Sequence, residues 1–110
     1  MHVDVLGHKD SVTDEVRAKA RAKMSRLGRR NPVLERAEVR LTEDPDAPTA
    51  RRQVCEIVLT GHGHVLRARA TSHDLQYALE QVVPKLEHQV ERLKGKLVAR
   101  SHPRRSGAVA

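Results

Sequence analysis

The hydrophobic positions in the last third of the chain recur at the spacing of a helix. At about 100° per residue they form one apolar stripe over residues 75–97. The members of this stripe are Leu75, Leu79, Val82, Leu86, Val90, Leu93 and Leu97. A basic stripe lies beside it, and the acids Glu80, Glu87 and Glu91 lie on the far side. The basic stripe comprises Lys85, His88, Gln89, Arg92, Lys96 and Arg100. A helix that needs only solubility usually mixes its charges as i,i+4 pairs, so this one-sided stripe indicates a polyanionic partner.

A second helix with the same division is predicted over residues 13–27. Thr13 is its expected N-cap, and Gly28 is expected to end it, with Pro32 beyond. Its apolar side consists of Val16, Ala20, Met24 and Leu27. Its basic side consists of Lys19, Lys23, Arg26 and, if the helix continues past Gly28, Arg30. The chain therefore presents two basic stripes, each on an amphipathic helix.

Alternating apolar and polar residues predict four strands, over residues 2–6, 35–43, 52–60 and 64–71. Gly61-His62-Gly63 predicts a tight hairpin, and residues 44–51 predict a flexible loop. Ser72 or His73 is expected to open the last helix, and Pro84 is expected to bend it at the cost of one hydrogen bond. The order strand, helix, three strands, helix predicts an α+β fold in which both helices cover one face of a four-stranded sheet. We expect one domain over residues 1–98, followed over residues 99–110 by a basic, disordered tail or the start of a linker.

The composition favours nucleic acid as the polyanion. The chain has 21 Lys and Arg against 14 Asp and Glu, a net charge of +7 at pH 7, which is more typical of nucleic-acid binding than of binding to small acidic molecules. Tyr77 is the only aromatic residue, so the stacking platforms of sequence-specific single-strand readers are missing, and recognition is expected to rest on phosphates and shape. No stretch approaches the about 18 consecutive apolar residues of a membrane span. We expect a soluble, cytoplasmic protein with no membrane partner.

Candidate catalytic and metal-binding residues are few. His62 and His64 lie on either side of a hairpin glycine, which raises a metal-dependent nuclease as one alternative. No HExxH or CxxC pattern accompanies them, and the sequence has no Ser-His-Asp order and no phosphate-binding glycine loop. Cys55 is the single cysteine, which excludes an internal disulfide, and its alternation with Ile57 and Leu59 predicts a small buried core residue. We therefore expect no catalytic residue, no metal, no cofactor and no small-molecule substrate.

Short motifs follow one another in a fixed order from the first strand to the end of the last helix. They are Gly7, Thr13-Asp14-Glu15, Ala22-Lys23, Arg26-Leu27, Asp74-Leu75, Ala78-Leu79-Glu80, Lys85-Leu86, Gln89, Arg92 and Lys94-Gly95-Lys96-Leu97. Over roughly residues 2–97, this series resembles the ribosome hibernation promoting factor family, also called ribosome-associated inhibitor A or sigma-54 modulation proteins. In that family a Tyr commonly follows the Asp-hydrophobic pair, whereas this chain has Gln76 there and Tyr77 one place later.

The resemblance implies a fold, a partner and a site. The fold is a βαβββα domain, similar in layout to a double-stranded-RNA-binding domain. The partner is the bacterial small ribosomal subunit, where the domain occupies the channel of messenger RNA and transfer RNA, competes with both, and inhibits translation in stressed or stationary cells. The family's basic helix positions fall on Lys23, Arg26, Lys85, Gln89, Arg92, Lys94 and Lys96.

The residues and the resemblance together give one predicted RNA-binding set. It comprises Lys19, Lys23, Arg26, Arg30, Lys85, His88, Gln89, Arg92, Lys94 and Lys96. On two parallel stripes, these side chains release counterions from the phosphates of ribosomal RNA without reading bases. A stand-alone double-stranded-RNA-binding module is the main alternative, but such a domain begins with a helix and concentrates its lysines at the start of its last helix. The sequence leaves open whether this is a short form or a fragment of a long form, and whether it promotes or prevents ribosome pairing.

Overall fold

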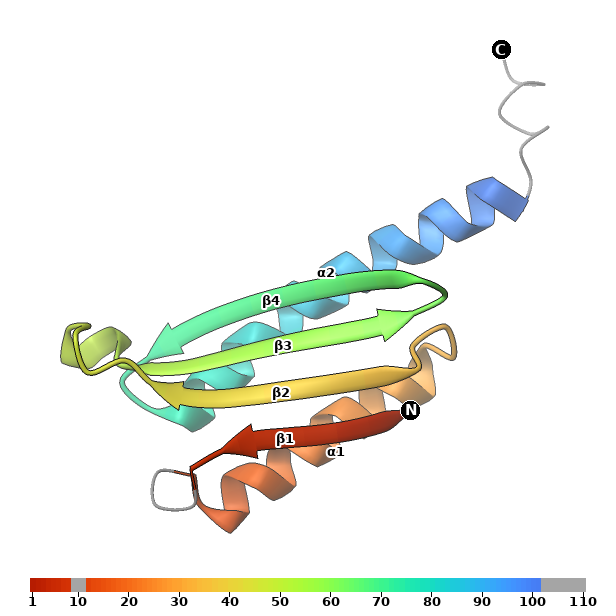
Figure 1. The fold of residues 1–110 in the computed structure, drawn as a ribbon. Helices are drawn as coiled ribbons and strands as arrows, with labels where there is room; N and C mark the ends of the chain where they lie inside the picture. Colours follow the sequence, from red (N-terminus) through yellow and green to blue (C-terminus); the bar gives the residue numbers. More distant parts are fainter. Residues whose placement is uncertain (9–11, 102–110) are drawn as a thin grey trace.

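The computed structural model describes residues 1–8 and 12–101, and its ribbon is one sheet with two helices on a single face (Figure 1). The elements are β1 (His2–Gly7), α1 (Asp14–Arg30), β2 (Arg36–Glu43), the short 3-10 helix η1 (Thr49–Arg51), β3 (Gln53–Gly61), β4 (His64–Ser72) and α2 (Leu75–Ser101). The predicted α+β fold, with its order strand, helix, three strands, helix, is confirmed.

The sheet has the strand order β1-β2-β3-β4. β1 runs parallel to β2, while β2 with β3 and β3 with β4 are antiparallel. A parallel pair needs a crossover connection, and α1 supplies it. In register, Val5, Val39, Ile57 and Ala68 form one continuous row across all four strands. All four side chains are buried, so this face of the sheet is the one that packs on the helices.

The apolar stripes of both helices are their buried faces, as predicted. Ala20, Met24 and Leu27 of α1 join the core cluster, together with the α2 stripe from Leu75 to Val90. Leu97, the last member of that stripe, is only partly buried, because the C-terminal part of α2 extends past the end of the sheet (Figure 1). Apart from Met24 and Cys55, the buried residues of this cluster are aliphatic.

The helix ends differ from the predicted ones because of polar caps. α1 continues past Gly28 to Arg30, where the Asn31 side chain donates to the Leu27 carbonyl at 2.9 Å and so satisfies the last turn. Asp74, rather than Ser72 or His73, opens α2, since its Oδ1 accepts from the Gln76 N–H at 2.8 Å. The predicted N-cap of α1 is confirmed, because the Thr13 hydroxyl accepts from the Val16 N–H.

The two remaining boundaries also needed correction. Part of the loop predicted over residues 44–51 is the 3-10 helix η1. α2 runs to Ser101, so residues 99–101 are helical, although the sequence pattern assigned them to the tail. The rest of the predicted tail, residues 102–110, lies outside the described residues. The hairpin prediction is confirmed: His62 and Gly63 have φ values of 50° and 77°, as a two-residue type I′ turn requires.

Candidate nucleic-acid interface

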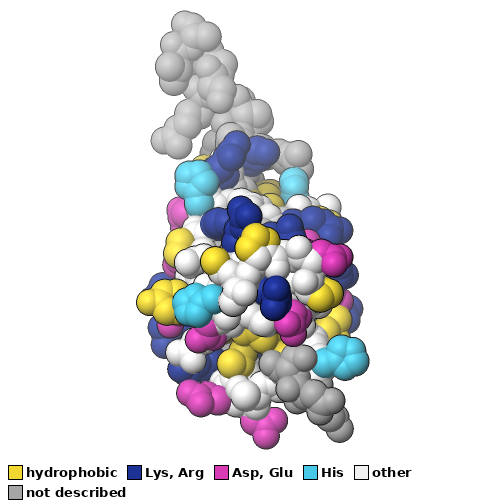
Figure 2. Space-filling view, turned by 90° about the vertical axis from the view of Figure 1, so that its left-hand side faces the viewer, with side chains coloured by type: hydrophobic (Ala, Val, Ile, Leu, Met, Phe, Trp, Pro, Cys, Tyr) yellow, Lys and Arg dark blue, Asp and Glu magenta, His cyan; other side chains and the backbone are white. Residues whose placement is uncertain are grey.

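Lys and Arg side chains lie on both helices and on β4. Figure 2 views the end at which β4 finishes and α2 begins, and its densest group of Lys and Arg side chains occupies the upper part of that view. Asp and Glu side chains lie at the lower end of the view and also along both of its sides. On this end of the surface, Lys and Arg are therefore densest towards the upper part, with acids around them.

The basic side of α2 lies against the outer edge of β4. The Lys85 Nζ donates to the carbonyl of Arg69 at 2.9 Å, and the Gln89 Nε2 donates to the carbonyl of Arg67 at 2.6 Å. β4 is an edge strand, so these carbonyls have no neighbouring strand to bond to. Two predicted RNA-binding residues thus also hold the helix on the sheet, a role that their sequence positions did not indicate.

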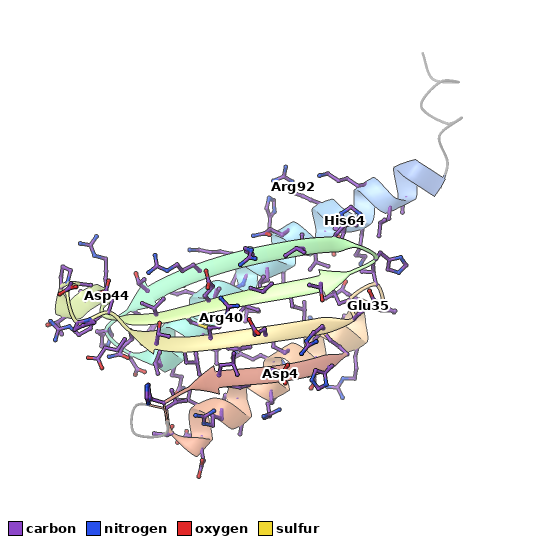
Figure 3. All side chains as sticks on the ribbon, viewed as in Figure 1. Asp4, Glu35, Arg40, Asp44, His64 and Arg92 are labelled. Carbon is purple, nitrogen blue, oxygen red and sulfur yellow. The ribbon has the colours of Figure 1, made fainter. Side chains whose placement is uncertain are left out.

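Farther along α2, the same side forms a groove with β4. Arg92 and Lys96 of α2 line it opposite His64 and Leu66 of β4, and its volume is about 400 Å³. Figure 3 shows Arg92 and His64 on this side of the molecule, at the outer edge of β4. Arg92, Lys96 and the neighbouring His88 are exposed. Within residues 1–8 and 12–101, neither Arg92 nor Lys96 forms an ion pair with an acid, so their charge is available to an anion.

The basic stripe of α1 has different surroundings. Lys23, Arg26 and Arg30 face α2 across a groove that Val83 and Glu87 line from the other side. The groove continues past Arg30 to Glu91 and Lys94 of α2. The acidic side of α2 therefore lies beside the basic stripe of α1, and the two basic stripes do not join into one surface.

Two members of the predicted set are paired with acids, since Lys19 contacts Glu15 at 3.4 Å and Lys94 contacts Glu91 at 3.5 Å.

Two further α1 arginines, which the predicted set did not include, lie against the other edge of the sheet. Arg17 donates to the carbonyls of Val5 and Gly7 at 3.3 and 2.7 Å, and Arg21 donates to the carbonyl of Val3 at 3.2 Å. They cover the edge of β1 as Lys85 and Gln89 cover the edge of β4. The i,i+4 spacing of these arginines was the available signal, but the pattern did not show which strand they reach.

The sheet face that the helices leave open carries a ladder of ion pairs. Arg36 contacts Asp4 at 2.9 Å, and Arg40 lies between Glu38 at 2.7 Å and Glu56 at 3.5 Å. Asp4 and Arg40 lie on the face towards the viewer in Figure 3. The hydrogen bond from Arg36 lowers the pKa of the Asp4 carboxyl below its usual value. The charges on β1, β2 and the middle of β3 are thus largely compensated on this face.

The candidate enzyme residues are not brought together with further ligands. Among residues 1–8 and 12–101, no three His, Cys, Asp or Glu side chains are grouped so that they could hold a metal ion. Cys55 is fully buried, and desolvation raises the pKa of its thiol to about 12, which fits the predicted core role. No helix in the described part of the chain is long and apolar enough to cross a membrane.

Residues 3–98 match the family described as sigma 54 modulation protein and S30EA ribosomal protein. The chain belongs to this family. The resemblance drawn from its sequence motifs is thereby confirmed. Among curated proteins, none matches the chain in sequence.

Solved structures share the fold, and two of them are similar over most of this chain. The N-terminal domain of Protein Y from Thermus thermophilus is 27% identical, with a TM-score of 0.68, and the match covers 84% of this chain and 99% of that one. A ribosomal subunit interface protein from Coxiella burnetii is 17% identical, with a TM-score of 0.72, and the match covers 86% of this chain and 99% of that one. Both similarities extend over nearly the whole described domain.

In this member of the sigma 54 modulation and S30EA family, the basic helix positions divide between two surfaces. Lys23, Arg26 and Lys94 line the groove between the helices. The members on the β4 side of α2 are Lys85, Gln89, Arg92 and Lys96. The β4 side carries fewer acids, and this makes it the stronger candidate for an anionic partner.

Proposed function

We propose that this protein binds the small ribosomal subunit in the channel used by messenger RNA and transfer RNA, and thereby inhibits translation in stressed or stationary bacterial cells. Membership of the sigma 54 modulation and S30EA family supports a ribosomal partner. The similar Coxiella burnetii structure bears the name of a ribosomal subunit interface protein, which is in keeping with that partner. Its site of action would be the cytoplasm, where ribosomes work.

The observation that carries the proposal is the unpaired positive charge on the β4 side of α2. Arg92 and Lys96 are exposed, line one groove and form no ion pair within the described part of the chain. Ribosomal RNA presents closely spaced phosphates, and each cation that meets one releases a counterion. Tyr77 is the single aromatic side chain of the protein, so base stacking contributes little and shape and phosphate contacts dominate.

Such a protein acts by occupancy rather than by turnover. The groove offers cations and amides but no activated nucleophile, and the one thiol is buried in the core. Inhibition should therefore be stoichiometric, with translation in a purified system falling in proportion to added protein. No RNA should be cut during the inhibition.

Charge removal in the groove tests the proposal. In the variant Arg92→Gln/Lys96→Gln we expect the affinity for purified small subunits to fall, and the slope of log K against log salt to become shallower by about 1.4 to 1.8, since two phosphate contacts are lost. Arg29→Gln/Arg51→Gln is the matched control, because both arginines are exposed and neither lines the groove between α2 and β4. Sedimentation of subunits with each protein over a salt series gives both quantities. Equal slopes for variant and control would contradict the proposed interface.

A further inference from the structure

Arg67 and Arg69 of β4 project from the open face of the sheet. They alternate with Ala68 and Ala70, which are buried against the helices. Both arginines are exposed. They are not among the basic helix positions, because they lie on a strand.

These two arginines differ from the other two on the same face. Arg36 and Arg40 are held by acids, whereas Arg67 and Arg69 form no ion pair in the part of the chain that the structure describes. Glu56 is the register partner of Arg69 across β3 and β4, but its carboxylate contacts Arg40 at 3.5 Å. Arg67 stands opposite Val58, which offers no charge. Along β4, the open face thus carries two arginines that are not engaged in ion pairs of the described residues.

The backbone of the same two residues joins them to α2. The carbonyl of Arg69 accepts from Lys85, and the carbonyl of Arg67 accepts from Gln89. The basic side of α2 therefore follows one side of β4, and the two arginines stand on the other. Next along the strand, His64 and Leu66 line the groove with Arg92 and Lys96. Cations from a helix and from a strand thus border a single edge of the sheet.

We infer that Arg67 and Arg69 bind RNA phosphates together with Arg92 and Lys96, so that the RNA backbone follows the edge of β4. This inference rests on the proposed function and names a surface that the helices alone do not provide. Arginine suits the role because its planar guanidinium donates two parallel hydrogen bonds to one phosphate. The edge of β4, rather than the groove between the helices, is the main RNA contact, because the inter-helix groove also contains Glu87 and Glu91.

The test compares Arg67→Gln/Arg69→Gln with the control Arg29→Gln/Arg51→Gln. Both variants lower the net charge by two, so general electrostatic attraction changes equally. We expect the β4 variant to bind purified small subunits roughly tenfold more weakly than the control, with a salt slope shallower by about 1.4 to 1.8. Arg67→Lys/Arg69→Lys keeps the charge and should keep most of the slope while losing part of the affinity. Thermal unfolding of each variant shows whether it is folded.

Several results would overturn the inference. If the β4 variant binds subunits as the control does, the arginines do not contact RNA, and the proposed function stands without them. If that variant instead self-associates at unchanged affinity, the arginines serve only to keep the strand edge from pairing with another chain.

A second probe separates the inference from the proposed function. An RNA duplex of about 16 base pairs, added to the labelled wild-type protein, should shift the backbone amide resonances of residues 64–71 and 85–96. If small subunits do not bind the wild type but the duplex shifts these resonances, the proposed function fails and the phosphate-binding edge remains. If the duplex shifts only α1 and its groove, or nothing at all, the inference fails as well.

Discussion

Cys55 illustrates how the core controls a single titratable group. Its side chain is fully buried in the aliphatic cluster, and desolvation raises the pKa of the thiol from an ordinary 9.0 to about 12. The folded state therefore keeps a proton that the unfolded chain loses above about pH 9. Stability that depends on this proton is complete below the unfolded pKa and decreases as the pH rises towards the folded one.

A pH series on Cys55→Ala tests this linkage. Above about pH 9, the free energy of unfolding of the wild type should fall more steeply than that of the variant, by about 1.4 kcal/mol per pH unit. Urea unfolding between neutral pH and about pH 10.5 measures the difference, because the other titrating groups are shared. Parallel curves for the two proteins would show that the thiol is not held in a low-dielectric core.

Sequence patterns predicted the position of a residue well where burial determines it, and poorly where a side-chain hydrogen bond determines it. The alternation of Cys55 with Ile57 placed that cysteine in the core correctly. The bonds of Lys85 and Gln89 to β4 could not be foreseen, because a periodic pattern gives the side of a helix but not the strand beside it. As a result, Lys85 is unsuitable for a charge-reversal test, since a carboxylate there would face the Arg69 carbonyl.

At the scale of elements, the order of helices and strands followed from periodicity, and the errors fell at the ends. Asn31 and Asp74 close helix termini through side-chain bonds, and such bonds move a boundary by a few residues without changing the apolar stripe. The strands were predicted to within one residue at each end because alternation stops where a turn begins. Local chemistry thus fixes the ends, while burial fixes the elements.

Pro84 tests how α2 tolerates a missing donor. It lies inside the helix with its side chain exposed, so the carbonyl one turn earlier, at Glu80, loses its usual N–H partner. Pro84→Ala restores the donor and should raise the free energy of unfolding by about 1 to 3 kcal/mol. Gln81→Ala, another exposed position of the same helix, controls for the helix propensity of alanine. Urea unfolding gives both values, and a destabilised Pro84→Ala protein would mean that the packing of α2 on the sheet depends on the proline.

At the scale of the whole molecule, the sequence could not show how the two basic stripes are oriented. Each stripe was visible on its own helix, but the fold turns the α1 stripe towards Glu87 and Glu91 and the α2 stripe towards β4. The relative rotation of two helices is set by their packing on a common sheet, which no local pattern encodes. The candidate site is therefore partly a property of the assembled fold. Arg67 and Arg69, which we infer to belong to it, lie beside α2 because their carbonyls accept from Gln89 and Lys85.

Reciprocal competition is the most direct test of the proposal that the protein and transfer RNA exclude each other on the small ribosomal subunit. Affinity of purified small subunits for the protein should be measured with and without saturating transfer RNA, and affinity for transfer RNA with and without saturating protein. By linkage, the two affinities should fall by the same large factor. Simultaneous binding of both at undiminished affinity would contradict the account.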